Sequence, residues 1–267
     1  MSLLDTLADL VLPAACAGCG AERVPLRYGV CPACAAALEA LAPAPAGPSP
    51  RPAGLPPCIA LGPYGGPLRG ALLAYKEKGR HRLARPLGHL LAGVVAAAVP
   101  PGPVLLVCVP STARASRQRR GDHLARLAAH GVRRLRAAGW DAAVVRPLRA
   151  LPRPDSATLD RSGRAAAAQA FLRVRPARLS RLRRAVAEGA RLVVVDDIVT
   201  TGATLAAVAV LLGREGVAIE GAAVLAATER RGAITGGRAP SVPDGAPWAN
   251  LHESVVRTKG DARAQRR

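Results

Sequence analysis

The stretch VVVDDIVTTGAT, residues 193–204, decides the fold and directs the search for a site. Its three consecutive valines predict a buried strand, which ends on two adjacent carboxylates, Asp196 and Asp197. In a parallel sheet, ligands bind beyond the carboxyl ends of the strands. Two acids in this position could chelate a metal, take up a proton or accept hydrogen bonds from vicinal hydroxyls.

The loop after the acids favours the last of these roles. Thr200, Thr201, Gly202, Ala203 and Thr204 open a predicted helix. At a helix N-terminus the free backbone N–H groups and the helix dipole favour an anion. The hydroxyls add donors and the glycine allows close approach, so the loop predicts a phosphate site. A phosphate beside two carboxylates fits a sugar phosphate, whereas the G-x-x-x-x-G-K-[ST] motif of nucleoside triphosphatases is absent from the sequence.

Short apolar runs alternate with helical patterns over the rest of the chain. This alternation predicts an α/β fold with a parallel sheet. The expected strands are 59–64, 104–110, 142–148, 191–198 and 218–227, and the expected helices include 66–79, 83–99 and segments containing Leu124–Leu135 and Leu205–Leu212.

Four of the six cysteines form two Cys-x-x-Cys pairs, Cys16 with Cys19 and Cys31 with Cys34. Each pair brings two thiolates to one metal from a single turn, and two pairs complete a tetrahedral zinc site. With all four positions filled by thiolates, the predicted zinc is structural. Cys58 and Cys108 lie in apolar runs and are expected in the core.

Composition indicates a cytoplasmic protein with an affinity for anions. The N-terminus has no basic residue before its apolar stretch and Asp5 and Asp9 interrupt it, so no signal peptide is expected. No apolar run is long enough to span a bilayer. The net charge of +20 favours polyanionic partners, although an arginine-rich codon bias is the alternative. Aromatic residues make up only 2%, which argues against a platform for stacking bases.

The predicted organisation has four parts. An N-terminal helix and the four-cysteine knuckle occupy residues 1–41, and a Pro-rich linker occupies 42–57. The α/β domain covers 58–234, and residues 235–267 are expected to form a disordered tail.

The strand, acids and loop together resemble the phosphoribosyl-pyrophosphate (PRPP) signature of type I phosphoribosyltransferases. In that family the two acids contact the ribose hydroxyls and the loop holds the 5′-phosphate. The Cys-x-x-Cys pairs, YGGPLRGALLAYKEKGR (64–80), VPSTARASRQRRG (109–121) and LDRSGRAAAAQAF (159–171) resemble the ComF (ComFC) family of competence-associated phosphoribosyltransferases. That resemblance implies PRPP with Mg²⁺ as ligands and a link to the uptake of single-stranded DNA.

The resemblance also implies roles for residues outside the signature. Ser111, Thr112 and Arg114 lie where the family has its pyrophosphate loop. Lys76 matches a basic residue that faces the same anion, or is a solvated cation at a helix end. Arg161 and Arg164 lie where a mobile lid would close, or on the surface. The chain departs from the family pattern at Asp122 and His123, where Phe-Asn is frequent, and at Ser156.

Two functions follow from these patterns. The first is a Mg²⁺-dependent phosphoribosyltransferase with an unknown acceptor. The alternative is a non-catalytic protein of the same fold that binds single-stranded DNA or a competence helicase. Arginine clusters at 114–136 and 173–184 could track a nucleic-acid backbone or be solvated helix faces.

Overall fold

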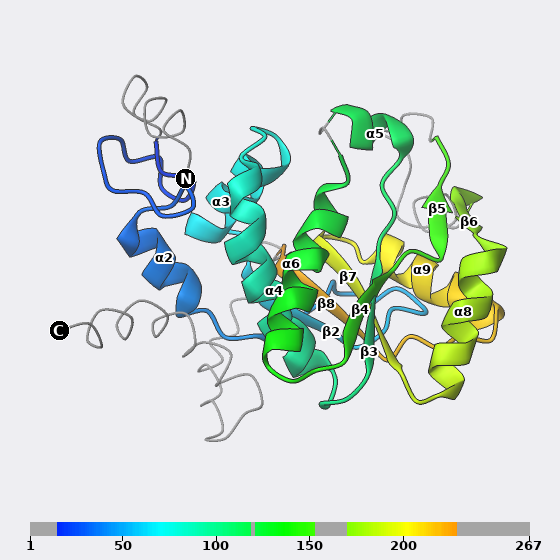
Figure 1. The fold of residues 1–267 in the computed structure, drawn as a ribbon. Coiled ribbons are helices and arrows are strands. Elements are labelled where there is room, and N and C mark those ends of the chain that lie inside the picture. Colours follow the sequence, from blue (N-terminus) through cyan, green and yellow to red (C-terminus); the bar gives the residue numbers. More distant parts are fainter. Residues whose placement is uncertain (1–14, 119–120, 153–169, 229–267) are drawn as a thin grey trace.

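The structure is a computed structural model, and it describes residues 15–118, 121–152 and 170–228 (Figure 1). Four features of the sequence analysis lie outside the described residues: the N-terminal amphipathic helix, the departure at Ser156, the lid positions Arg161 and Arg164, and the segment 235–267. Within the described part of the chain, no helix has both the length and the apolar character needed to cross a membrane.

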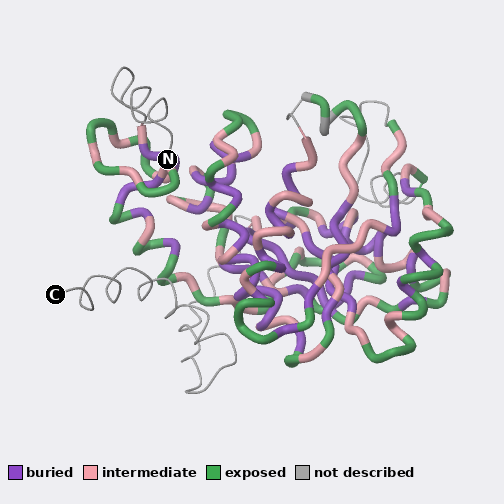
Figure 2. The backbone as a smooth tube through the Cα atoms, in the orientation of Figure 1, coloured by how far each residue is buried: buried purple, intermediate pink, exposed green. Residues whose placement is uncertain are grey.

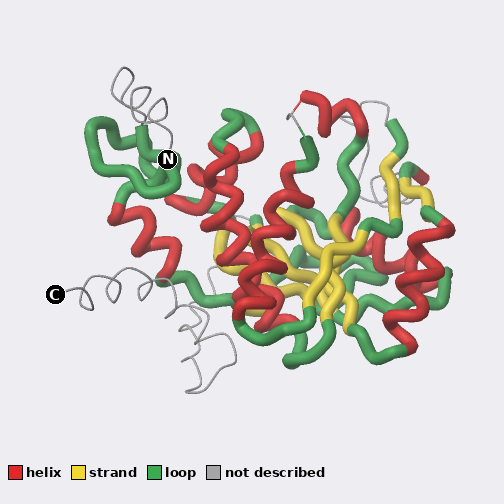
Figure 3. Tube along the Cα trace, in the orientation of Figure 1, coloured by secondary structure: helices red, strands yellow, loops and turns green. Residues whose placement is uncertain are grey.

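A six-stranded sheet forms the centre of the fold (Figure 3). All its neighbouring strands are parallel except the first pair, which is antiparallel. The valines at 193–195 are buried because β7 lies between two other strands and is covered by helices on both faces. The order is β1 (Ala44–Pro45), β2 (Cys58–Pro63), β8 (Gly221–Ala227), β7 (Arg191–Val199), β3 (Val104–Cys108) and β4 (Ala142–Val145).

Helices cover both faces of this sheet, as the alternating sequence pattern predicts. A 3₁₀ turn, η1 (His81–Leu83), leads into α4 (Ala84–Ala98), which packs on β2 and β8 beside α6 (His123–Ala137). On the opposite face, α9 (Ala203–Arg214) packs on β7 (Figure 1). Gly88 and Gly131 let α4 and α6 approach closely, since a Cβ on Gly88 would lie 2.7 Å from the carbonyl oxygen of Leu127.

Buried residues concentrate in the strands and on the helix faces turned toward them (Figure 2). Cys58 and Cys108 are both buried in this core, as predicted. The mixed α/β fold with a mostly parallel sheet is therefore confirmed.

One predicted strand, 142–148, is wrong in its extent. The strand β4 ends at Val145, and β5 (Leu148–Ala150) pairs antiparallel with β6 (Leu172–Val174) in a separate two-stranded sheet. Pro147 lies between them and has no N–H to donate to a sheet ladder, which explains the break. The helices α5 (Ala113–Gln118) and α8 (Pro176–Ala187) overlap the two arginine clusters, for which solvated helix faces were one of the two interpretations.

The Pro-rich segment 42–57 is extended and packs against the α/β domain. Its residues 44 and 45 form β1 at the edge of the sheet. Further along, Leu55 is buried, and its side chain lies where a Cβ on Gly202 would meet it at 3.1 Å. This segment therefore supports the loop that follows β7.

The N-terminal knuckle packs on the helix that follows β2. This helix, α3 (Gly66–Lys76), contacts α2 (Pro32–Glu39). A Cβ on Gly70 would lie 2.2 Å from the carbonyl oxygen of Gly18, so only glycine allows this approach. The guanidinium of Arg80 also donates a hydrogen bond to the carbonyl oxygen of Ala15.

Candidate functional site

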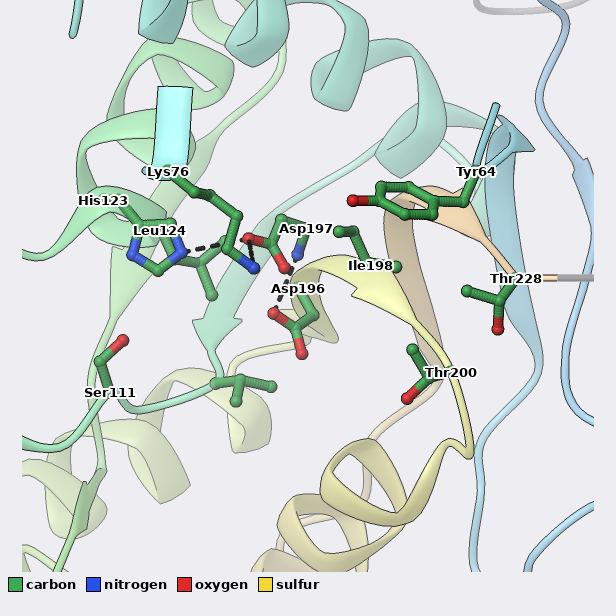
Figure 4. Close-up of a pocket in the computed structure, with 11 residues that line it drawn as sticks. Tyr64, Lys76, Ser111, His123, Leu124, Asp196, Asp197, Ile198, Thr200 and Thr228 are labelled. Atoms are coloured by element: carbon green, nitrogen blue, oxygen red, sulfur yellow. Dashed lines mark hydrogen bonds and ion pairs between the residues drawn. The ribbon is translucent and has the colours of Figure 1, made fainter. Parts of the chain in front are cut away.

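A pocket of about 400 Å³ lies at the carboxyl ends of β2, β3, β7 and β8 (Figure 4). Its volume falls in the range of small-molecule sites, which is about 300–1,000 Å³. Its position is the one expected for a ligand site in a parallel sheet. Polar lining comes from Tyr64, Lys76, Ser111, His123, Asp196, Asp197, Thr200 and Thr228, and apolar lining from Val109, Leu124 and Ile198.

The two acids of β7 both reach this pocket but in different environments. Asp197 is 4% exposed, whereas Asp196 is partly exposed. Successive side chains of a strand point to opposite faces, and Asp197 points toward α3 and α6. There its Oδ2 lies 2.8 Å from Lys76 Nζ and 3.1 Å from His123 Nε2. The backbone N–H of Asp197 donates to Asp196 Oδ1 at 2.9 Å.

These environments move the pKa values of the two acids in opposite directions. Burial raises the pKa of Asp197, but the hydrogen bond from His123 and the charge of Lys76 outweigh it and lower this pKa to about 2. Burial and the negative charge of Asp197 raise the pKa of Asp196 well above its ordinary value. The pair therefore combines a stabilised carboxylate with one that holds its proton more tightly, a combination common in functional sites.

The loop after β7 leads into the N-terminus of α9. Gly202 is the N-cap of α9 with φ of 69°, a left-handed conformation that favours glycine. The hydroxyl of Thr201 accepts from the N–H of Ala203 at 3.4 Å, and Thr200 lines the pocket. Thr204 lies in the first turn of α9. Only Thr200 of the five predicted loop residues is part of the pocket wall.

The other predicted site residues divide into two groups. Ser111 lines the pocket on the side of His123, opposite Thr200 (Figure 4). Thr112 and Arg114 follow it but are not part of the pocket wall, and Arg114 is exposed. Lys76 does reach the pocket, where it forms an ion pair with Asp197.

Sequence reasoning gave no role to His123, which the structure places against the acid pair. The available signal was the departure from the ComF pattern at this position. Tyr64 and Thr228 were also missed, and they follow the last residues of β2 and β8 at the same edge of the sheet.

The four predicted metal ligands come together in the knuckle. The sulfur atoms of Cys16, Cys19, Cys31 and Cys34 all lie within 4.8 Å of one another, and those of Cys19 and Cys31 are 3.9 Å apart. Thiolates about 2.3 Å from one tetrahedral zinc would be about 3.8 Å apart, so these residues fit the ion.

Local backbone geometry supports the thiolate form of one ligand. Burial raises the pKa of Cys16, but hydrogen bonds from the backbone N–H groups of Cys19, Cys31 and Gly18 outweigh it and lower this pKa to about 6. A Cβ on Gly18 would lie 2.7 Å from Cys34 Sγ, so glycine is required to close the cluster.

Comparison with known families agrees with this geometry. Residues 159–236 match the phosphoribosyl transferase domain. The match covers less than half of the chain, and it includes β7, α9 and β8 with the acid pair and the loop. It supports a relationship to the type I phosphoribosyltransferase superfamily, and it does not single out the ComF family. No curated protein matches the chain.

Proposed function

We propose that this protein binds PRPP with Mg²⁺ and transfers its phosphoribosyl group to an acceptor. The observation that carries the proposal is the adjacent acid pair at the end of β7, which lines the pocket together with Thr200, two residues before the Gly202 N-cap of α9. Carboxylates can accept hydrogen bonds from the hydroxyls of a ribose, and a helix N-terminus favours a phosphate.

Each part of the pocket has a role in this proposal. Asp196 and Asp197 accept hydrogen bonds from the ribose hydroxyls, and residues 200–204 donate to the 5′-phosphate. Transfer breaks the bond between C1 and the pyrophosphate oxygen, and positive charge develops on the ring. Bound Mg²⁺ would neutralise the negative charge of the departing pyrophosphate. Ser111 lines the pocket on the far side of the acids from Thr200, which supports a role as hydrogen-bond donor to that leaving group.

Titration calorimetry with PRPP and Mg²⁺ tests the binding step. We expect Asp196→Asn/Asp197→Asn to bind at least about tenfold more weakly, because each lost charged hydrogen bond costs about 1.5–3 kcal/mol. Asp141→Asn is the matched control, since Asp141 is exposed and follows the helix α6 at the opposite end of the strands. Equal affinity in the double variant and the control would remove the proposed site.

Pyrophosphate release over a panel of bases and amines tests the transfer step. Pyrophosphate release with one acceptor class identifies the acceptor. Absence of release with every compound of the panel favours a non-catalytic protein. The resemblance to the ComF family extends the proposal to DNA uptake, with a competence helicase as a candidate partner class.

An alternative function is the binding of single-stranded DNA, and the arrangement of arginines favours it. Arg149 lies directly opposite Arg173 in the β5–β6 pair, an arrangement that repels. Burial lowers the pKa of Arg175, and the charges of Arg178 and Arg146 lower it further. A polyanion would relieve this repulsion.

A salt series separates this alternative from the first function. Affinity for a single-stranded oligonucleotide should fall steeply with salt, and Arg149→Ala/Arg173→Ala should reduce the slope. Absence of binding at low salt would remove DNA as a ligand. PRPP binding should be unchanged in this variant.

A further inference from the structure

His123 and Asp197 are both buried, and they bind each other. His123 is 7% exposed and its Nε2 lies 3.1 Å from Asp197 Oδ2. A buried carboxylate without hydrogen-bond partners is strongly unfavourable, so each of these contacts matters to the ionised form.

The backbone of His123 is held on two sides. It is the first residue of α6, whose N-cap Asp122 accepts from the N–H of Ala125 at 3.0 Å and pairs with Arg146. The hydroxyl of Tyr75, next to Lys76 in α3, donates to the carbonyl oxygen of His123 at 2.6 Å.

The ring of His123 is fixed as well. It packs edge-on against the ring of Tyr75, with centroids 6.2 Å apart and planes at 62°. Because backbone and ring are both constrained, Nε2 is held in a defined direction toward Asp197 (Figure 4).

The contacts of Asp197 are unequal between its two oxygens. Lys76 and His123 both bind Oδ2, so they hold that oxygen from two elements and fix the rotation of the carboxylate. The other oxygen, Oδ1, is then presented in a constant direction. Lys76 alone would leave the carboxylate of Asp197 free to rotate, because a single ammonium group on a flexible side chain does not define the orientation of the carboxylate plane.

We propose that His123 is a positioning residue for PRPP, which holds Asp197 through Nε2 so that Oδ1 meets the ribose diol. This inference rests on the proposed function. It requires that Nε2 carry the proton and donate to the carboxylate, and His123 itself need not touch the ligand.

Two substitutions test separately the hydrogen bond that His123 donates and the packing of its ring. His123→Phe keeps an aromatic ring against Tyr75 and removes the donor. His123→Gln keeps an amide N–H at about the reach of Nε2 and removes the ring. A purely structural role would make the aromatic variant the better replacement, whereas the positioning role makes the amide variant the better one.

PRPP titration with Mg²⁺ and thermal unfolding are measured on both variants and the unsubstituted chain. We expect His123→Phe to bind PRPP about tenfold more weakly, the loss typical of one charged hydrogen bond, and His123→Gln to stay within about threefold. Equal affinity of His123→Phe and the unsubstituted chain overturns the positioning role, whatever the melting temperature. An equal loss of PRPP affinity in His123→Phe and His123→Gln would also overturn the positioning role.

The two proposals fail in different ways. If the unsubstituted chain binds no PRPP, the proposed function falls and this inference falls with it. If the unsubstituted chain binds PRPP and His123→Phe binds equally well, only the role of His123 is removed.

Discussion

Lys76 at the end of α3 and Asp197 at the end of β7 form an ion pair with 2.8 Å between Nζ and Oδ2. The lysine side chain is 19% exposed and the aspartate side chain 6%. The pair joins the helix that packs on the four-cysteine knuckle to the strand that carries the acid pair. The helix α3 therefore contacts both the knuckle and the acid pair.

Lys76→Met should destabilise the protein by about 3 kcal/mol, because it leaves a buried carboxylate with one partner fewer. Urea unfolding measures the change. Lys78→Met is the control, since Lys78 is exposed two residues further on, and should change stability by less than about 0.5 kcal/mol. Equal effects of the two substitutions would show that the ion pair contributes nothing.

Asp196→Asn should stabilise the protein at neutral pH. The raised pKa of Asp196 means that the folded state binds its proton more tightly than the unfolded state. Ionisation therefore costs stability as the pH rises above the unfolded value of about 3.9. The stability advantage of the variant should vanish near pH 3, where Asp196 is protonated in both the folded and the unfolded state. Unfolding at a series of pH values measures this difference in stability. A variant that is less stable than the unsubstituted chain at pH 7 would contradict this assignment.

Asp197 should show the opposite dependence on pH. Its folded pKa of about 2 lies below the unfolded value, so its contribution is present above about pH 4 and is lost as the pH falls toward 2. The stability difference between the unsubstituted chain and Asp197→Asn should shrink over this range. A difference that stays constant between about pH 6 and about pH 2 would rule out the stabilised carboxylate.

Purified protein should contain one zinc per chain by elemental analysis, and a chelator should loosen α3 as well as the knuckle. Hydrogen exchange of residues 66–76 should rise after zinc removal, because Gly70 packs directly on the knuckle backbone. A zinc content near zero without chelator would remove the metal assignment. Unchanged exchange in α3 would remove the connection between knuckle and pocket.

Gly70→Ala tests the same contact without removing metal. A Cβ there would overlap the carbonyl oxygen of Gly18, and we expect a loss of about 1–3 kcal/mol. Gly93→Ala in α4 is the matched control, because no atom outside its chain neighbours and the adjacent backbone of its own helix lies within 4 Å of its Cβ position. It should stabilise the helix by up to about 1 kcal/mol. Similar effects of the two substitutions would contradict the close packing.

The strands β2, β3, β7 and β8, the acid pair and the loop could be predicted from sequence because each depends on local patterns. Three valines before Asp196 mark a buried strand end, and Gly202 marks a helix start. The cysteine spacing likewise predicts the metal cluster without any long-range information. Such features need no knowledge of which elements pack together.

The partners of Asp197 could not be predicted, because they come from two other elements. His123 is 74 positions away in the chain and Lys76 is further still, and only the packing of α3 and α6 over β7 brings them together. The break of the strand at Pro147 was readable from sequence, since proline interrupts a ladder. The approach of Leu55 to Gly202 depends on the path of the Pro-rich segment, which composition alone does not specify.

A crystal structure with PRPP and Mg²⁺ tests the central claim most directly. The account predicts ribose hydroxyls within hydrogen-bond distance of Asp196 and Asp197, and the 5′-phosphate on the backbone N–H groups of residues 200–204. Ligand bound elsewhere, or with its phosphate away from the start of α9, would contradict it.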